Sequence, residues 1–434
     1  MRKIFSLVFI SVLSFNFVYA QQDTVKIMSY NLLNYRNYNT TFCTNNNNNV
    51  ALKEGYLTTI IADQNPDILI CNEIGADFIN GIRLVQNSLN VNGVSHWAQA
   101  NYSVTPGSSL TNMLFFNSTK FGLLSQTVID KDTSNINLVR LIDVYTLYFK
   151  EANMTNFTDT VFFTVMAAHL KAGNSAPDIT ERAKATTAVM TYLDQNNIQG
   201  NIFIAGDFNV YTGNEPAFQD LINYAPNPTV RFFDPINTIG SWNNNGSFSF
   251  AHTQSVRSSS NGCASGGGMD DRFDFILVSD EVLNNVNRVN YVPNSYKALG
   301  QDGLRFNGNI NFPANTLVSS TVADALYNMS DHLPVIASFA ISPSGSVSVT
   351  ENVKSSNYMV NNPIRDMLMI QKIGENFNKA ELQIIDLNGR IALKHGIANS
   401  SIERVKTSEI KRGTYILRIF EEGVLVKNEK LILI

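Results

Sequence analysis

Residues 201–209 read NIFIAGDFN, an apolar run that ends in two polar residues, Asp207 and Asn209. Short runs rich in isoleucine and phenylalanine are typical of buried strands. Because side chains alternate along a strand, Asp207 and Asn209 point to the same side of its end. A carboxylate and an amide placed together at the end of a buried strand predict a functional site.

The same pattern recurs at five other places in the chain. Apolar runs at 25–30, 67–71, 113–116, 161–168, 201–205, 273–278 and 335–339 predict strands, and most have a polar residue at one end. These residues are Asn31, Glu73, His169, Asp274 and the pair Asp331-His332. Each alone has an ordinary explanation, as a turn residue, a helix-terminal acid, a core histidine, a strand-edge charge or a helix cap. Together they predict one acidic cleft at the rim of the sheets.

The residue types in this cleft favour hydrolysis of a phosphate ester. Clustered carboxylates without matching cations call for a metal ion, and oxygen ligands suit Mg²⁺, Mn²⁺ or Ca²⁺. His169 and His332 add groups that exchange protons near neutral pH. A metal that neutralises phosphoryl oxygens and a water activated by a base together make this reaction possible.

The rhythm of the chain between residues 23 and 340 predicts an α/β sandwich. Helices are expected near 53–63 and 180–195, the second opened by a capping box of Asp178 and Glu181. Helices interleaved with apolar strands indicate two sheets covered by helices. The Gly-, Ser- and Asn-rich stretch 242–270 is long for a connection, as functional loops often are.

Both ends of the chain carry signals of export and of a second domain. Arg2 and Lys3 precede an apolar run that ends at Ala20, which predicts a signal peptide over residues 1–20 and a secreted protein; a membrane anchor is the alternative. Residues 342–356 are expected to form a linker between a catalytic domain at 21–341 and a small all-β sandwich at 357–434. The turn Asn388-Gly389 predicts a hairpin there.

Charge and cysteine content limit the partners of the protein. The net charge of −4 becomes −6 without Arg2 and Lys3, which argues against a protein that coats nucleic acid through positive charge. Cys71 lies in an apolar run and is expected to be a buried thiol. Cys43 and Cys263 both lie in loop-like sequence and could pair, or remain free, in an exported chain.

The order of these motifs over about residues 24–340 resembles the endonuclease/exonuclease/phosphatase superfamily, and Gly-Asp-Phe-Asn (206–209) and Ser-Asp-His (330–332) are its most specific elements here. The resemblance implies a four-layered α/β sandwich, like that of deoxyribonuclease I. It implies that Glu73 is the main metal ligand, helped by Asn31 and Asp331, and that Asp207 and Asn209 position the nucleophilic water and a phosphate oxygen. It also implies that His332, held by Asp274, is the general base, and that His169 stabilises the phosphate or assists the leaving group.

The sequence departs from this superfamily in two places, and two arginines are candidates for contact with substrate. Gly75 stands two residues after Glu73, where many nucleases of the superfamily carry a cation, and Thr111 and Asn112 stand near the position of a glutamate that orients the first histidine in deoxyribonuclease I. Arg140 lies in the segment that carries a phosphate-contacting arginine in deoxyribonuclease I, and is a possible substitute cation. Arg257, in the loop at 251–257, is a second candidate for contact with substrate.

The last 75 or so residues resemble the C-terminal sorting domain of the type IX secretion system. The resemblance rests on Asn362-Pro363 and on residues 382–390, 413–417 and 430–434. It implies that this domain directs the protein across the outer membrane through the type IX machinery. An ordinary β module that binds substrate or a surface is the alternative.

The sequence therefore predicts a secreted, divalent-metal-dependent phosphodiesterase, with an extracellular nuclease acting on DNA or RNA as the leading hypothesis. A phospholipid or sugar-phosphate phosphodiesterase of the same fold is the first alternative, and a surface-binding protein without activity is the second. We expect no stable insertion in a membrane, because no aromatic or amphipathic hairpin is evident in the sequence.

Overall fold

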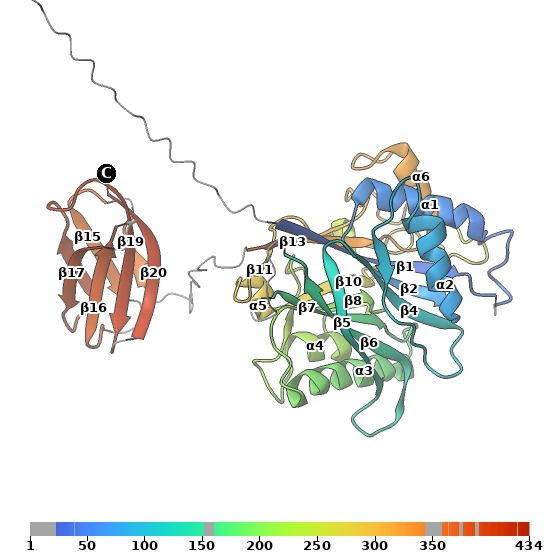
Figure 1. The fold of residues 1–434 in the computed structure, drawn as a ribbon, viewed down its shortest axis with the longest axis horizontal. Helices are drawn as coiled ribbons and strands as arrows, with labels where there is room; N and C mark the ends of the chain where they lie inside the picture. Colours follow the sequence, from blue (N-terminus) through green and yellow to red (C-terminus); the bar gives the residue numbers. More distant parts are fainter. Residues whose placement is uncertain are drawn as a thin grey trace, which may run out of the picture. The chain divides into compact units, whose positions relative to one another are not determined.

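The computed structural model describes residues 23–38, 40–151, 160–342, 358–362, 364–372, 376–386, 390–422 and 424–433. The chain divides into two compact units, Met1–Ser348 and Val349–Ile434, which are described separately (Figure 1). The expected signal peptide, all but the first residue of the expected linker and the Asn388-Gly389 turn lie outside the described residues. No helix in the described part of the chain is long and apolar enough to span a membrane.

The first sheet of the larger unit is built around two parallel strands, β1 and β2, that lie side by side with Ile27 opposite Ile68. Antiparallel strands extend the sheet on both sides, in the order β11-β13-β1-β2-β4-β3, with β12 paired to β13. The strands are β1 (Asp23–Tyr35), β2 (Ile68–Gly75), β3 (Trp97–Gln99), β4 (Leu110–Asn117), β11 (Val289–Tyr291), β12 (Lys297–Ala298) and β13 (Val335–Ile341).

The second sheet repeats this plan with β7 and β8 as its parallel pair, and its order is β5-β6-β7-β8-β10-β9. Its strands are β5 (Phe121–Lys131), β6 (Asn137–Phe149), β7 (Phe162–His169), β8 (Ile202–Asp207), β9 (Phe232–Phe233) and β10 (Asp274–Ser279). The two sheets face each other through a core that includes Phe163 and Phe203 from the second sheet. The next residue on β8, Ile204, points to the opposite face and joins a separate core with α3.

Helices cover the outer faces, so that the unit is a four-layered α/β sandwich (Figure 1). α1 (Val50–Gln64) and α6 (Ser320–Met329) lie against the first sheet, and α3 (Ala176–Gln195) and α4 (Pro216–Ile222) lie against the second. Shorter elements are α2 (Phe78–Leu84), a π-helical turn η1 (Val85–Leu89), the 3₁₀ helix η2 (Gly246–Ala251) and α5 (Asp280–Leu283). The central strands are buried on both faces, which explains their continuous apolar sequence.

Two helix starts differ from the sequence-based expectation. The capping box of α3 consists of Ser175 and Asp178, so the helix begins at Ala176, one turn earlier than a box of Asp178 and Glu181 would allow. α1 begins at Val50 because the side chain of Asn49, the last residue of the asparagine run, accepts a hydrogen bond from the Leu52 backbone.

The smaller unit is all-β within its described residues, as expected. One sheet contains β14 (Tyr358–Val360), β15 (Met367–Lys372) and β18 (Ile402–Lys406). The other has the order β17-β16-β19-β20, formed by β16 (Ala380–Ile385), β17 (Ile391–Ile397), β19 (Gly413–Glu421) and β20 (Val424–Leu433). Leu368 and Ile370 of the first sheet share one core with Leu382 and Leu417 of the second, which makes the unit a small sandwich.

Candidate active site

Strand pairing gathers the predicted site residues at one rim of the larger unit. Parallel strands end at the same rim, so β1 and β2 place Asn31 directly beside Asn72, which precedes Glu73. In the second sheet His169 is the register partner of Asp207, and Asp207 is the partner of Asp274 on antiparallel β10. Strand pairing alone therefore explains why His169 and Asp274, 105 positions apart in the chain (274 − 169), lie on either side of Asp207.

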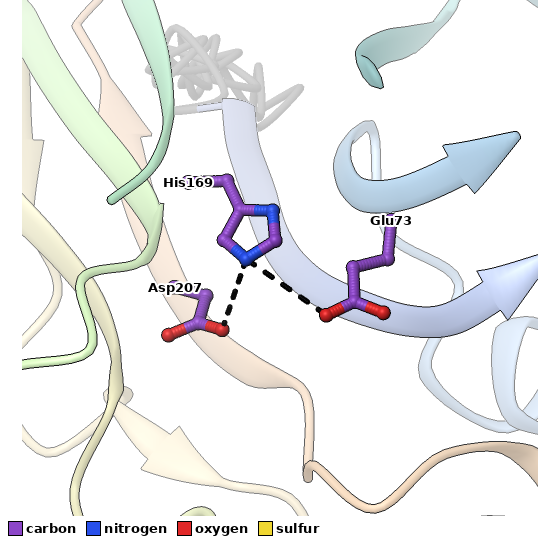
Figure 2. Close-up of side chains that lie close together, drawn as sticks. All are labelled: Glu73, His169 and Asp207. Carbon is purple, nitrogen blue, oxygen red and sulfur yellow. Dashed lines mark ion pairs between the residues drawn. The ribbon is translucent and has the colours of Figure 1, made fainter. Parts of the chain in front are cut away.

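Three of these side chains form the closest cluster. Ligand-type atoms of Glu73, His169 and Asp207 all lie within 4.8 Å of one another (Figure 2). His169 Nε2 is 3.6 Å from Asp207 Oδ2 and 3.8 Å from Glu73 Oε1. Asn31 Nδ2 donates to both carboxylates, at 3.1 Å in each case. Burial raises the pKa of Asp207 to about 7, with His332 acting against this rise and the charges of Asp274 and Glu73 adding to it.

Glu73 is held in place by the turn in which β1 ends, where the strand is irregular between Asn31 and Tyr35. The backbone of Glu73 has φ of 59°, a left-handed conformation that costs a non-glycine residue free energy and is often found at functional sites. The backbone and side-chain amides of Asn34 both donate to Glu73 Oε2, at 3.0 and 3.2 Å. These bonds fix one carboxylate oxygen and leave Oε1 turned toward His169 and Asn31 (Figure 2).

His332 is paired with Asp274, as the sequence predicts, through a bond of 2.8 Å between Nδ1 and Oδ2. Burial alone would lower the pKa of His332, but Asp274 and Asp207 outweigh it and raise the pKa well above its ordinary value. The other ring nitrogen, Nε2, lies 2.7 Å from the amide of Gln254 and 3.8 Å from Asp207 Oδ2. His332 is therefore set up to hold a proton that it can exchange at Nε2.

The pKa of His169 is shifted in the opposite direction to that of His332. Burial lowers its pKa well below the ordinary value, and the positive charges of Arg140 and His332 lower it further. In the described part of the chain no carboxylate is within hydrogen-bonding distance of its ring, since Asp207 and Glu73 lie at 3.6 and 3.8 Å. His169 is thus a neutral imidazole beside two acids.

Asn209 and Asp331 lie next to this cluster rather than within it. The Asn209 backbone donates to Asp207 Oδ1 at 3.0 Å, and its side chain donates to the Leu170 carbonyl at 3.3 Å. Asp331 Oδ2 accepts a hydrogen bond from the Ser265 backbone at 2.8 Å. Among the described residues, Asp331 is not part of the closest metal-type group, so its role as a ligand remains a prediction.

The donor atoms fit a hard divalent cation. Glu73 and Asp207 are two buried or half-buried carboxylates, and the histidine that lies between them, His169, has a lowered pKa and does not neutralise them. Such a pair of acids is stabilised by a metal ion that prefers oxygen ligands. Asn31 would serve as a ligand through its amide oxygen, whereas here the nitrogen faces the carboxylates and the oxygen accepts from the Leu33 backbone at 2.9 Å. A flip of the amide would turn the oxygen toward the cation and give up the bond to Leu33.

The two predicted substrate arginines differ in their surroundings. Arg140 lines a small cavity together with His169 and Asn112, and donates to the Leu170 carbonyl at 2.6 Å. Burial lowers the pKa of Arg140, while Glu73 and Asp207 act against this change, so its guanidinium lies near the cluster. Arg257 is instead buried against α6, where it donates to the Tyr327 carbonyl and lies 4.3 Å above the Tyr327 ring. Contact between Arg257 and substrate remains a prediction that this arrangement does not favour.

Gly75 stands at a position where many nucleases of the superfamily that the sequence resembles carry a cation. The structure gives a steric reason for the glycine. A Cβ added there would lie 2.3 Å from the Arg36 carbonyl oxygen, so no side chain fits. Gly75 instead borders a cavity of about 400 Å³ that is also lined by Arg36, Tyr38 and Arg83. The cations on this side of Glu73 thus come from neighbouring segments.

Several residues that support the site were not predicted from the sequence. Asn72 accepts from the Asp207 backbone at 3.1 Å and donates to Asn112 at 2.8 Å, which ties the two sheets together beneath the cluster. Its position directly before Glu73, at the end of an apolar run, is the sequence feature that could have indicated this role. Gln254 lies in a long loop, and nothing in its local sequence indicates that it reaches His332.

Comparison with known proteins agrees with this division of the chain. Residues 361–434 match the family model of the secretion system C-terminal sorting domain. No curated protein sequence matches the chain.

Solved structures similar to the larger unit come from the endonuclease/exonuclease/phosphatase family. The human Nocturnin catalytic domain with bound sulfate has a TM-score of 0.44 and 14% identity, covering 74% of this chain and 98% of that one. A family member from Bacteroides thetaiotaomicron has a TM-score of 0.45 and 13% identity, covering 74% and 96%. TDP2 from D. rerio, complexed with a single-strand DNA product, has a TM-score of 0.43 and 13% identity, covering 73% and 98%.

Proposed function

We propose that this protein is a secreted, divalent-metal-dependent phosphoric ester hydrolase that cleaves phosphodiester bonds in nucleic acid. The observation that carries the proposal is that His169 and His332 both turn Nε2 toward one buried carboxylate oxygen, Asp207 Oδ2, at 3.6 and 3.8 Å, while their pKa values are shifted in opposite directions. Two titratable groups whose environments move their pKa values apart are suited to act as a proton acceptor and a neutral donor in one reaction. The match to a sorting domain supports export.

Each residue of the site has its own role in the proposed reaction. Asp207 and Asn209 orient the attacking water. His332 takes the proton of this water at Nε2 in the neutral form that it reaches above its raised pKa, while Asp274 keeps the ring in place. The water oxygen then bonds to phosphorus as the ester oxygen leaves. His169, as a neutral imidazole, donates a hydrogen bond to the phosphoryl group, and Arg140 adds positive charge beside it. Glu73, Asp207 and Asn31, with Asp331 as a further predicted ligand, would hold the divalent cation, which would neutralise charge on the phosphoryl oxygens.

Two features favour nucleic acid as the substrate. Arg140 lies beside the cluster, and the cavity bordered by Gly75 carries Arg83 and the exposed ring of Tyr38, together with Asp77 and with Arg36, which is paired with Glu54 at 2.5 Å. Cations and an exposed aromatic ring on either side of a cleavage site suit a polymer, which offers phosphates and bases beyond the bond that is cut. With a net charge of −4, we expect binding to depend on these few local cations and to weaken steeply as salt rises.

One observation favours a lipid phosphodiester as a second candidate. Leu304, Phe312 and Leu317 are 73%, 74% and 63% exposed, and all lie in the segment 301–318. The only charged residues of this segment, Asp302 and Arg305, neutralise each other in a buried ion pair at 2.6 Å. An uncharged segment with exposed apolar side chains suits contact with a lipid surface, although the sequence contains no evident hairpin for this purpose.

A direct comparison of substrates tests the proposal. The full chain is assayed with Mg²⁺ on plasmid DNA, RNA, sphingomyelin vesicles and bis-p-nitrophenyl phosphate, each with an EDTA control. We expect turnover of the model diester and of at least one nucleic acid, and loss of both in EDTA. A kcat/KM for sphingomyelin that exceeds those for both nucleic acids by about tenfold would exclude the nuclease assignment. In that case Leu304→Ser and Phe312→Ser should reduce activity on vesicles and leave the soluble diester unaffected.

A further inference from the structure

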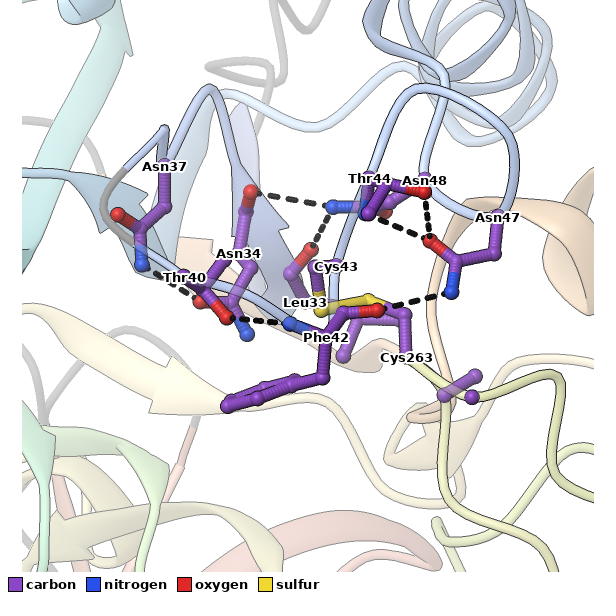
Figure 3. Close-up of a disulfide and its surroundings, with 12 residues drawn as sticks. Leu33, Asn34, Asn37, Thr40, Phe42, Cys43, Thr44, Asn47, Asn48 and Cys263 are labelled. Carbon is purple, nitrogen blue, oxygen red and sulfur yellow. Dashed lines mark hydrogen bonds between the residues drawn. A yellow bond between two sulfur atoms is a disulfide. The ribbon is translucent and has the colours of Figure 1, made fainter.

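Two loops that contain no predicted ligand surround the candidate metal site. The asparagine-rich loop (residues 37–49) connects β1 to α1, and the serine-rich loop (residues 255–268) belongs to the long connection before β10. The disulfide Cys43–Cys263 joins them across a sequence separation of 220 residues (Figure 3). The sequence left this pairing open, while Cys71 is a buried free thiol, as predicted.

The asparagine-rich loop reaches Glu73 through a chain of hydrogen bonds. Asn48 Nδ2 donates to the carbonyls of Leu33 and Asn34, both at 3.2 Å (Figure 3). Asn34 in turn donates twice to Glu73 Oε2. The turn that orients Glu73 is therefore held from outside by Asn48.

Lys53 completes this side of the site. Its ammonium group is buried and donates to Asn48 Oδ1 at 2.7 Å and to the carbonyls of Leu32 and Leu33 at 2.6 Å. Lys53 thus connects α1, the asparagine-rich loop and the turn after β1. A displacement of Asn48 would leave a buried cation short of one acceptor, so the position of the loop and that of the turn are coupled.

The serine-rich loop holds the other side in a similar way. The Ser265 backbone donates to Asp331 Oδ2 at 2.8 Å, and the Val256 backbone donates to the Asp331 carbonyl at 3.0 Å. Ser255 Oγ donates to the Ser265 carbonyl at 2.6 Å, which closes the loop on itself. Each loop therefore fixes one acid of the predicted metal set, Glu73 on one side and Asp331 on the other.

The junction between the loops depends on the disulfide. Beside it, Asn47 and Asn261 exchange two exposed hydrogen bonds, at 3.3 and 3.0 Å. Exposed hydrogen bonds contribute little, because water replaces them readily. A covalent link at this point therefore restrains the relative position of the two loops far more than the neighbouring contacts do.

We propose that the Cys43–Cys263 disulfide is a redox-dependent positioning element that sets the affinity of the site for its divalent cation. This inference rests on the proposed metal dependence. The bond forms when the two thiols exchange with a disulfide oxidant: one sulfur–sulfur bond forms in the protein, and the oxidant is reduced to two thiols. The chain binds metal weakly while both cysteines are reduced, as in a cytoplasm, and tightly once it is exported to an oxidising compartment.

The test measures metal binding directly, without a substrate. Mn²⁺ binding to the oxidised full chain is compared, by calorimetry and by the electron paramagnetic resonance of free Mn²⁺, with binding after reduction by dithiothreitol. We expect a dissociation constant at least about tenfold higher in the reduced chain, as for loss of other groups that orient metal ligands. Near-ultraviolet circular dichroism recorded on the same samples reports whether the fold is retained.

Matched variants assign the effect to this disulfide. Cys71→Ala removes the only other cysteine and should bind Mn²⁺ like the oxidised chain and remain sensitive to dithiothreitol. The double variant Cys43→Ser/Cys263→Ser should bind like the reduced chain and no longer respond. Equal affinity in folded oxidised and reduced chains overturns the inference, as does global unfolding on reduction, which would make the disulfide a stabiliser of the whole unit. Disulfide-dependent binding in a chain that cleaves no nucleic acid would instead refute the proposed substrate alone.

Discussion

His332 and His169 turn the same atom, Nε2, toward the same carboxylate oxygen, Asp207 Oδ2, at 3.8 and 3.6 Å. Yet the pKa of His332 is raised and that of His169 is lowered. Burial lowers the pKa of both rings, so the difference comes from the charged groups around each: Asp274 bonds to His332 at 2.8 Å, whereas the positive charges of Arg140 and His332 act on His169. Although both histidines lie near Asp207, the other charged groups around each ring set the direction of its pKa shift.

The largest effect should follow loss of the histidine that exchanges the proton. His332→Ala removes the group that accepts the proton of the attacking water, so we expect kcat to fall by about 10³-fold with little change in KM. Steady-state kinetics on bis-p-nitrophenyl phosphate measure this, with His332→Gln as a variant that retains more of the side-chain volume. Retention of more than about a tenth of kcat would contradict the assignment of His332 as the base.

A smaller effect is expected when the carboxylate bonded to His332 loses its charge, so that His332, like His169 among the described residues, has no carboxylate bonded to its ring. Asp274→Asn keeps the shape of the side chain but removes the charge that raises the pKa of His332. We expect kcat to fall by about 10²-fold and the acidic limb of the pH–rate profile to move to lower pH. An unchanged profile with reduced kcat would mean that Asp274 acts only by packing.

The reverse experiment removes a positive charge beside His169, so that its pKa rises toward that of His332. Arg140→Met removes a positive charge that lowers the pKa of His169, so this pKa should rise, and kcat/KM should fall by about tenfold as a phosphate contact is lost. The chain has five histidines, so the proton resonances of their rings can be followed individually in a pH titration. Arg140→Lys keeps the charge and is the control: its His169 resonance should titrate as in the parent chain.

The rim site could be predicted because it follows from strand ends. Asn31, Glu73, His169 and Asp207 each close an apolar run, and parallel pairing of β1 with β2 and of β7 with β8 must bring such ends to one rim. The four-layered sandwich and the all-β second domain, predicted partly from resemblance, are confirmed.

What depends on loop conformation could not be predicted. Gln254 contacts His332 because the loop 242–270 is folded by its own contacts, such as the bond from the Gln254 backbone to Asp271. The sequence around Arg257 is typical of an exposed loop, so an exposed cation was expected. In the structure the guanidinium of Arg257 instead packs against the ring of Tyr327. The hairpin of β5 and β6 was also missed: the solvent-facing residues of β5 interrupt its apolar pattern, so the sequence around it lacks the continuous run that marks the central strands.

The two histidines should also affect stability at acidic pH in opposite directions. The pKa of His169 lies below the ordinary 6.5, so as pH falls below 6.5 the unfolded chain takes up a proton that the folded chain does not, and stability is lost. For His332 the folded pKa is raised, so its stabilising contribution is fully present below 6.5 and is lost as pH rises through the folded value. Below pH 6.5, in metal-free buffer, His169→Gln should therefore lose less stability than the parent and His332→Gln more. Urea unfolding between pH 5 and 8 measures both; a parallel response of the two variants would contradict the comparison.

The smallest effect is expected from removing the C-terminal unit. Both histidines, their supporting groups and both cores of the sandwich lie before residue 343, and the C-terminal unit has a core of its own. We therefore propose that residues 357–434 serve export and contribute nothing to the charge states of His332 and His169. A chain that ends at Ser342 retains β13 and the carbonyl that binds Arg288, so it should fold by itself and keep the kcat/KM and pH profile of the full chain. Its export from the producing cell should fail. A shortened chain that is folded but inactive would mean that the C-terminal unit helps to build the site, and the difference between the two histidines would then have to be explained with groups from both units.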